Sequence, residues 1–351
     1  MMTFALVQFL GGYLADTHGR RRLIVAMTFA LALSFLFYAL APTWHFVMIG
    51  MMLSSLCLIH SPALRAMESD SLPPEKRGIG FSISMVTGIL SILSPLIAGF
   101  LYLSYGLVQG MRIAYFIVMV FFLLAAIIRT RLRETLDIGT GKVGLVDTLR
   151  AYPKAIRESI GVWRQVPRDA LYLFLIGTAG GFFAYMCVPY YVVYANAILH
   201  VDEFQWALLQ TFNYGMMFGS ALPIGKLVDL VGRKRPLIAS NILFMLSMWF
   251  FIYGDFPRLA VFLALSAVGN SLMVIADKSI MADLVPRKHR GKAMGCSAFI
   301  GNVTASVGQL MGGILYESFT PQLPFILLLI SFIPTTVLTL FLVHEPEKKE
   351  M

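Results

Sequence analysis

Long apolar runs separated by short polar breaks dominate the chain. A helix needs about 20 mainly apolar residues to cross a bilayer, at a rise of about 1.5 Å per residue. Eleven runs approach or exceed that length: residues 1–15, 23–41, 45–66, 79–102, 111–129, 170–194, 205–227, 236–254, 258–281, 292–316 and 323–343. Because these runs are continuous and do not alternate with polar residues, they predict membrane helices and not a transmembrane barrel.

Composition supports a membrane protein. Hydrophobic residues make up 58% of the 351 residues and charged residues only 13%, which is more apolar surface than a soluble chain of this length can bury. The net charge of +9 comes from short basic clusters between apolar runs and not from a face mixed with aromatic residues, so we expect no nucleic-acid partner. The three cysteines lie inside apolar runs without metal-ligand spacing, and we expect no metal or other cofactor.

Lysine and arginine fall almost entirely on one side of the predicted helices. Of the 28 basic residues, only Arg112 and Arg258 belong to connections on the other side. Basic loops next to membrane helices stay cytoplasmic. We therefore expect a multi-pass protein of the cell membrane with a cytoplasmic C-terminus.

The chain also contains an internal repeat. Residues 12–22 read G-Y-L-A-D-T-H-G-R-R-R, and residues 225–235 read G-K-L-V-D-L-V-G-R-K-R. We call the shift from residue 12 to residue 225 the repeat offset. The stretch from Asp70 to Gly78 matches the stretch from Asp283 to Gly291 at the same offset, and Gly99 matches Gly313 within one position of it. If each half holds six helices, the first half shows only five, so we expect one further helix before Met1.

These motifs resemble the major facilitator superfamily of secondary transporters. The family signature G-x-x-x-D-x-x-G-R-[RK] is filled twice, by Gly12, Asp16, Gly19, Arg20 and Arg21, and by Gly225, Asp229, Gly232, Arg233 and Lys234. The resemblance implies an all-α integral membrane protein with two helical bundles and about 11 transmembrane helices of an expected 12. The expected parts are an N-terminal bundle at 1–129, a cytoplasmic amphipathic linker at 130–169, a C-terminal bundle at 170–343 and a cytoplasmic tail at 344–351.

By this resemblance the signature residues gate the cytoplasmic side. Asp16 would contact the helix start at Gly291 in the other half, and Arg20 would pair near Glu68 or Asp70. The further gating candidates from the two repeats are Arg77, Asp283 and Arg290. The alternative is that these residues only set topology and anchor the loop.

Polar residues inside membrane helices are the candidates for substrate binding or coupling, because they are costly there unless they pair or line a wet path. His60 lies near mid-membrane beside Pro62, and Asp277 lacks a charged counterpart in the repeat. Either could serve transport or only helix packing. The remaining candidates are Tyr185, Asn213, Asn270, Asn302 and Gln309.

Family drug/proton antiporters often carry G-P-x-x-G-G in the fifth helix, of which residues 94–99 keep only Pro95 and Gly99. No nucleotide loop or nucleophile–base arrangement is present in the sequence, so we expect neither an enzyme nor a nucleotide partner. We expect a monomeric secondary transporter in membrane lipid that moves a small organic or drug-like solute by alternating access, with protons as the candidate coupling ion. The alternative is a non-transporting sensor, partner-binding protein or inactive truncation product on the same scaffold.

Overall fold

The computed structural model describes residues 20–61, 63, 64, 67, 92–134, 161, 163, 166–285 and 287–345. This described part is helical and contains no strand. It divides into two units, one made of Met1–Leu90 with Ile97–Glu158 and the other of Ser91–Leu96 with Ser159–Met351. The expected helix at residues 1–15 and most of the expected linker at 130–169 lie outside the described residues.

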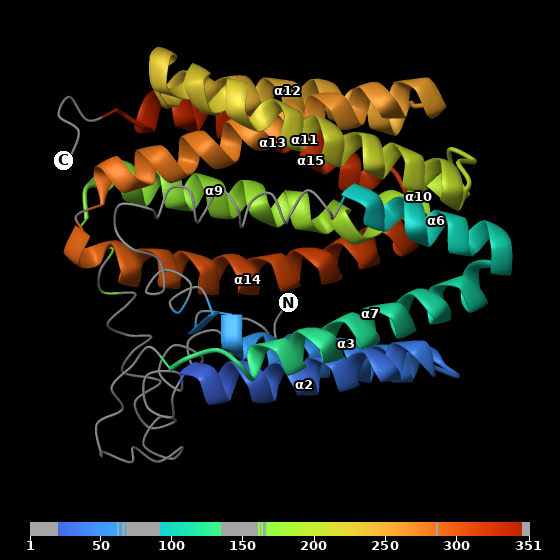
Figure 1. The fold of residues 1–351 in the computed structure, drawn as a ribbon. Coiled ribbons are helices and arrows are strands. Elements are labelled where there is room, and N and C mark those ends of the chain that lie inside the picture. Colours follow the sequence, from blue (N-terminus) through green and yellow to red (C-terminus); the bar gives the residue numbers. More distant parts are fainter. Residues whose placement is uncertain are drawn as a thin grey trace. The chain divides into compact units, whose positions relative to one another are not determined.

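The N-terminal unit is built around α2. Its described elements are α2 (Arg20–Ala39), α3 (Trp44–Cys57), the 3-10 turn η1 (Leu58–His60), the part of α6 (Leu93–Tyr105) from Ile97 onward, and α7 (Leu107–Arg129). Helix α2 packs against both α3 and α7 (Figure 1). Aromatic rings fill the seam between α2 and α7, where Phe35 stacks on Phe122 at 5.3 Å and Tyr38 on Tyr115 at 4.9 Å between ring centroids.

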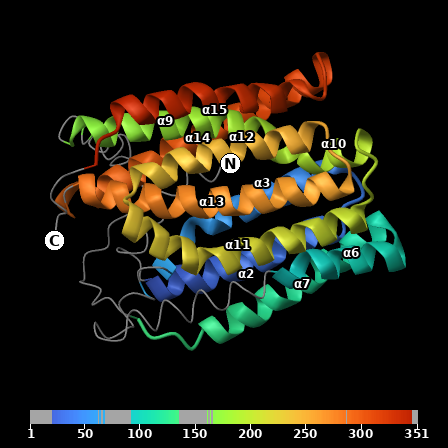
Figure 2. The same cartoon turned by 90° about the horizontal axis from the view of Figure 1, so that it is seen from above.

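The C-terminal unit contains six long helices among its described residues. Its elements are α9 (Arg168–Cys187), η5 (Val188–Tyr190), α10 (Tyr191–Ala197), α11 (Glu203–Val231), α12 (Lys234–Ile252), α13 (Phe256–Leu284), α14 (Arg287–Ser318) and α15 (Leu323–Leu342). Helix α13 packs against α11 and α12, α9 packs against α14 and α15, and α12 also packs against α15 (Figures 1 and 2).

The internal repeat is visible in the helix boundaries. Helices α2 and α7 of the first unit correspond, by the repeat offset, to α12 and α15 of the second. Helix α2 begins at Arg20 and α12 at Lys234, so the expectation of a loop is wrong for Arg20, Arg21 and Lys234, whereas Arg233 precedes α12. A positive charge at a helix N-terminus is unfavourable, and each unit compensates for it with a carboxylate.

Three other sequence-based boundaries differ. Helices α6 and α7 are separated by Gly106 alone, at φ +75°, so Arg112 lies inside α7 and not in a connection. The expected helix 170–194 is interrupted by η5 at Pro189, which cannot donate a backbone hydrogen bond. Helix α14 begins at Arg287, which places Arg290 and Gly291 inside it.

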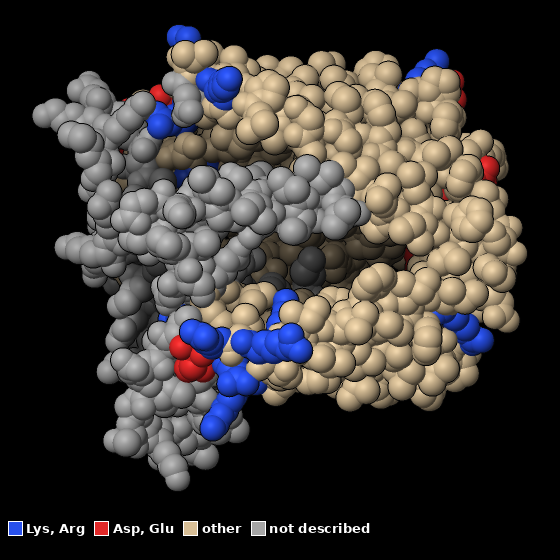
Figure 3. Space-filling view, viewed as in Figure 1, with Lys and Arg blue, Asp and Glu red and all other residues tan. Residues whose placement is uncertain are grey.

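The outer faces of the helices are apolar. Within the described residues, seven helical segments are long and apolar enough to cross a membrane, and Trp44–His60 and Leu93–Tyr105 are shorter apolar helices. Lysine and arginine gather where α2 begins and α7 ends in one unit and where α12 begins in the other, while the lengths of the helices carry other residues (Figure 3). Lipid is the solvent that such apolar faces require. The all-helical membrane fold predicted from the sequence is confirmed.

Candidate functional site

The second signature copy ends in a carboxylate-capped helix. Gly232 precedes α12, and the backbone N–H of Arg233 donates to Glu345 Oε1 at 2.6 Å. The N–H of Lys234 donates to the same oxygen, and Lys234 Nζ donates to the carbonyl oxygen of Leu340 at 2.7 Å. We call Arg233, Lys234, Leu340 and Glu345 the C-terminal clasp. It joins the start of α12 to the end of α15, with an anion where the helix dipole favours one.

Gly232 is required by this geometry. Its φ of +93° lies in the region that L-residues with a side chain rarely adopt. A Cβ atom built on Gly232 would also lie 3.0 Å from Glu345 Oε2. The glycine therefore both turns the chain and leaves room for the capping carboxylate.

The first signature copy forms a matching clasp. The backbone N–H of Arg21 donates to Glu134 Oε2 at 3.0 Å, and Arg21 Nη2 donates to the carbonyl oxygen of Thr130 at 2.5 Å. We call Arg21, Thr130 and Glu134 the N-terminal clasp. Arg21 and Lys234 are equivalent by the repeat offset, so equivalent basic residues hold the end of α7 in one unit and of α15 in the other.

Glu134 and Glu345 are not among the residues predicted from the sequence. Each glutamate follows the last helix of its half, and this position was the signal that the sequence offered. The two glutamates lie closer together than the repeat offset, so the repeat does not align them. Gly12, Asp16, Gly19, Glu68, Asp70 and Arg77 lie outside the described residues. For Asp229, Asp283, Arg290 and Gly291 the structure describes the helical backbone and not the side chains.

His60 belongs to a buried polar cluster inside the N-terminal unit. Its side chain is 4% exposed, and Thr28 is fully buried. Arg129 Nη1 donates to Thr28 Oγ1 at 2.7 Å and lies 3.4 Å from His60 Nε2, while His60 Nδ1 lies 2.7 Å from the carbonyl oxygen of Cys57. Because arginine only donates and a carbonyl only accepts, this arrangement requires a neutral His60 with its proton on Nδ1. Thr28, His60 and Arg129 therefore connect α2, η1 and α7.

Two of the asparagine candidates join α11 to α13. Asn213 Nδ2 donates to the carbonyl oxygen of Leu263 at 3.1 Å, and Asn270 Nδ2 lies 3.7 Å from Met217 Sδ. Such amide bonds hold membrane helices together.

The other candidates lie on α9, α13 and α14. Asn302 and Gln309 use their backbone carbonyls to accept from Ser306 Oγ at 2.8 Å and Tyr190 Oη at 3.3 Å, respectively. Tyr185 on α9 and Asp277 on α13 are half-buried, and neither side chain forms a hydrogen bond with any described residue. Among the described residues no group of three or more His, Cys, Asp or Glu side chains could hold a metal ion.

A match to a known protein family covers the whole chain. The sequence model of the Major Facilitator Superfamily matches residues 1–219 and 173–351, and these two matches together cover the whole chain. This chain belongs to the Major Facilitator Superfamily. Its members are transporters, so the comparisons favour transport over the non-transporting alternative.

The curated relatives within the superfamily include antiporters and resistance proteins. The chain is 25% identical over 332 residues to a Na(+), Li(+), K(+)/H(+) antiporter of Planococcus maritimus, covering 85% of this chain and 76% of the relative. It is 37% identical over 109 residues to the methyl viologen resistance protein SmvA of Salmonella typhimurium, covering 30% of this chain and 21% of that protein. A multidrug resistance protein 3 of Bacillus subtilis is 30% identical over 121 residues, or 34% of this chain and 23% of that one.

Solved transporters share the fold. A POT family transporter in complex with 5-aminolevulinic acid superposes with a TM-score of 0.74 at 13% identity, over 97% of this chain and 85% of that one. The nucleoside transporter NupG gives a TM-score of 0.68 at 12% identity, over 98% of this chain and 91% of that one. The prediction of a major-facilitator-type fold is confirmed.

Proposed function

We propose that this major facilitator exports a small organic or drug-like solute across the cell membrane in exchange for protons. The observation that carries the proposal is the presence of ionisable groups inside membrane helices of a chain whose full length matches the transporter family. The relatives named for resistance or for cation/proton antiport support exchange and outward transport. Methyl viologen is an organic cation, so cationic solutes are the first class to test.

His60 is the proposed coupling group of the N-terminal unit. A neutral His60 can accept a hydrogen bond from Arg129, whereas a protonated imidazolium has no acceptor left and repels the guanidinium. Protonation would therefore release Arg129 from η1 while leaving its bond to Thr28. In this proposal, proton uptake loosens one end of α7.

Asp277 is the proposed coupling or substrate group of the C-terminal unit. Its half-buried carboxylate lies within the span Phe256–Met281, and the cation that acts on it is Lys278, the next residue in the chain. A carboxylate in a membrane helix is costly unless it is protonated or meets a cation. Tyr185 is the proposed aromatic contact, and Asn213, Asn270, Asn302 and Gln309 remain candidates for lining the solute path.

The signature residues and the clasps are proposed to act at the cytoplasmic gate. The basic clusters at the starts of α2 and α12 support a cytoplasmic location for both, and for the C-terminus. The parts at 1–129, 130–169, 170–343 and 344–351 are retained as the proposed bundles, linker and tail, in a monomer.

Transport can be measured on the purified chain in proteoliposomes. We expect a pH gradient to drive uptake of methyl viologen or a cationic dye into vesicles that are acidic inside, with proton release accompanying each solute. Na(+), Li(+), K(+), a dipeptide and a nucleoside are run as parallel candidate solutes. A folded protein that moves none of these solutes with or without the gradient would refute the proposal.

The coupling groups are tested by variants that cannot titrate. His60→Gln and Asp277→Asn should each reduce gradient-driven flux at least about tenfold, as expected for loss of a proton-transfer group. Their controls are His45→Gln and Asp255→Asn, since both parent residues are exposed at helix ends. Unchanged coupled flux in His60→Gln or in Asp277→Asn would eliminate that residue as a coupling group.

A further inference from the structure

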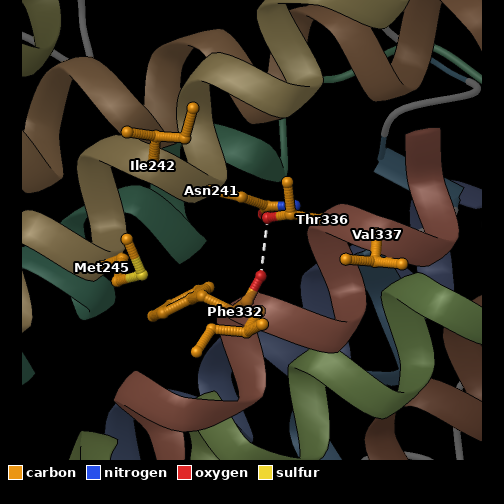
Figure 4. Close-up of a pocket in the computed structure, with 7 residues that line it drawn as sticks. Asn241, Ile242, Met245, Phe332, Thr336 and Val337 are labelled. Carbon is orange, nitrogen blue, oxygen red and sulfur yellow. Dashed lines mark hydrogen bonds between the residues drawn. The ribbon is translucent and has the colours of Figure 1, made fainter.

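A groove lies between α12 and α15 on the outside of the C-terminal unit. It has a volume of about 190 Å³ and is lined by Asn241, Ile242 and Met245 from α12 and by Phe332, Ile333, Thr336 and Val337 from α15 (Figure 4). Its volume is below the roughly 300–1,000 Å³ of a site for a drug-sized ligand. A slim chain fits this volume better than a drug-sized solute does.

The groove opens toward the surface that lipid covers. Ile242 is 44% exposed, Ile333 53% and Val337 46%. Helices α12 and α15 are both long and apolar enough to span the membrane. An occupant of this groove therefore enters from the bilayer.

Two polar side chains make the groove unlike a plain lipid-facing seam. Thr336 Oγ1 donates to the carbonyl oxygen of Phe332 at 2.6 Å, which leaves its lone pairs free to accept (Figure 4). The carboxamide of Asn241 forms no hydrogen bond with any described residue of the chain. An amide without a partner is costly in hydrocarbon, so the occupant should itself carry hydrogen-bonding groups.

The equivalent seam of the N-terminal unit shows what the second unit lacks. Thr28 is the equivalent of Asn241 by the repeat offset and occupies the same place on α2. There the seam is bridged by a side chain, because Arg129 of α7 donates to Thr28 at 2.7 Å. At the end of α15 the corresponding residue is the apolar Leu342, so α15 offers Asn241 no such donor.

An exposed cation lies on the same face of α12 as the groove. Arg235 lies seven residues before Ile242, which places both on one face of the helix two turns apart. Asn241 is six residues beyond Arg235, or about 9 Å along the helix. This order of cation, amide and apolar groove matches the order of phosphate, ester carbonyl and acyl chain in a phospholipid.

We propose that the α12/α15 groove binds one anionic phospholipid. Its phosphate pairs with Arg235, an ester carbonyl accepts from the Asn241 amide, and the first part of an acyl chain fills the space beside Val337. Thr336 serves as an acceptor for a lipid hydroxyl. This proposal requires the membrane-spanning fold and is independent of which solute is transported.

Native mass spectrometry of the purified full chain tests the site with phosphatidylglycerol against phosphatidylethanolamine as probes. We expect the anionic lipid to be retained about fivefold more than the zwitterionic one, the effect typical of one basic side chain at a membrane surface. Arg235→Gln should remove this preference, Asn241→Leu should lower retention of both lipids, and Val337→Phe should block the groove. Glycerol phosphate without acyl chains should not be retained.

The N-terminal unit provides matched controls. Arg22 and Leu124 are the equivalents of Arg235 and Val337 by the repeat offset and are exposed on α2 and α7. Arg22→Gln and Leu124→Phe should leave the retained lipid unchanged. If Arg235→Gln, which alters an exposed side chain and should fold normally, keeps the wild-type preference, the proposal is overturned. A dimer whose formation Val337→Phe abolishes, with no retained lipid, would instead assign the groove to a second copy.

Discussion

The seam between α2 and α7 in the N-terminal unit is bridged by an arginine, whereas the equivalent seam between α12 and α15 in the C-terminal unit contains an open groove. In the first, Arg129 binds Thr28 and lies 3.4 Å from His60 Nε2. In the second, Asn241 stands where Thr28 stands in the first, and it faces a groove of about 190 Å³. One duplicated helix pair thus holds a buried polar bridge in the first unit and an open groove in the second.

The helix ends do not differ in this way. In each unit a basic side chain of the signature, Arg21 or Lys234, donates to a backbone carbonyl near the end of α7 or α15. In each unit a glutamate also accepts from a backbone N–H group at the start of α2 or α12. Features kept in both units are the ones the duplicated fold needs, because each unit must solve the same problem of a basic helix start. Features present in one unit only, such as His60 and the groove, are better candidates for specific function.

The largest expected effect comes from breaking the bridged seam. Arg129→Met removes the donor to two buried acceptors and should lower the free energy of unfolding by about 3 kcal/mol. Arg131→Met, at an exposed position just past α7, should change it by less than about 0.5 kcal/mol. Denaturation of the purified protein in detergent measures both free energies of unfolding. Equal losses in the two variants would show that the buried cluster adds no more stability than an exposed arginine does.

An intermediate effect is expected at the signature glycines of the C-terminal unit. Gly232→Ala should cost about 2 kcal/mol, because of its φ of +93° and its contact with Glu345. Gly225→Ala is the control, since it lies inside α11 with open space around its Cβ position, and it should be neutral or stabilise by up to about 1 kcal/mol. Thermal unfolding of the two variants distinguishes them, and equal losses would mean that neither the positive φ nor the contact with Glu345 makes Gly232 special.

The smallest effect is expected at the two clasps. Glu345 accepts from the backbone N–H groups of Arg233 and Lys234, and Glu134 accepts from that of Arg21. Glu345→Ala and Glu134→Ala should each lower the free energy of unfolding by up to about 1 kcal/mol, the range for an anion at a helix N-terminus. Salt should weaken both effects. An unchanged stability of either variant, measured by the same denaturation, would show that its carboxylate does not stabilise the helix start.

The apolar runs located every long helix that the structure describes, because continuous hydrophobicity of about 20 residues has few other physical explanations. Helix ends were less accurate. Arg20, Lys234 and Arg290 are polar and therefore suggested loops, yet all three lie in helices. Polar residues indicate where the chain leaves the hydrocarbon of the membrane. They do not indicate where a helix ends, because a helix continues as long as its backbone hydrogen bonds and its end caps are satisfied.

The candidate sites could be predicted only in part. His60 was found because a histidine in an apolar run is conspicuous, but its contact with Arg129 was not, since the two lie far apart in the sequence. Glu134 and Glu345 looked like ordinary residues of a loop and a tail. Asn241 could not be predicted as a site residue, because only the packed structure shows which side chains surround its amide.

By itself the sequence determined the solvent of this protein, the duplication and the superfamily, because composition and motif spacing carry these properties locally. Tertiary structure alone decided which carboxylate caps which helix, that Arg129 bridges one seam and that the equivalent seam holds a groove. Those outcomes depend on side chains from distant parts of the sequence meeting within hydrogen-bond distance. Only the packed helices bring them there.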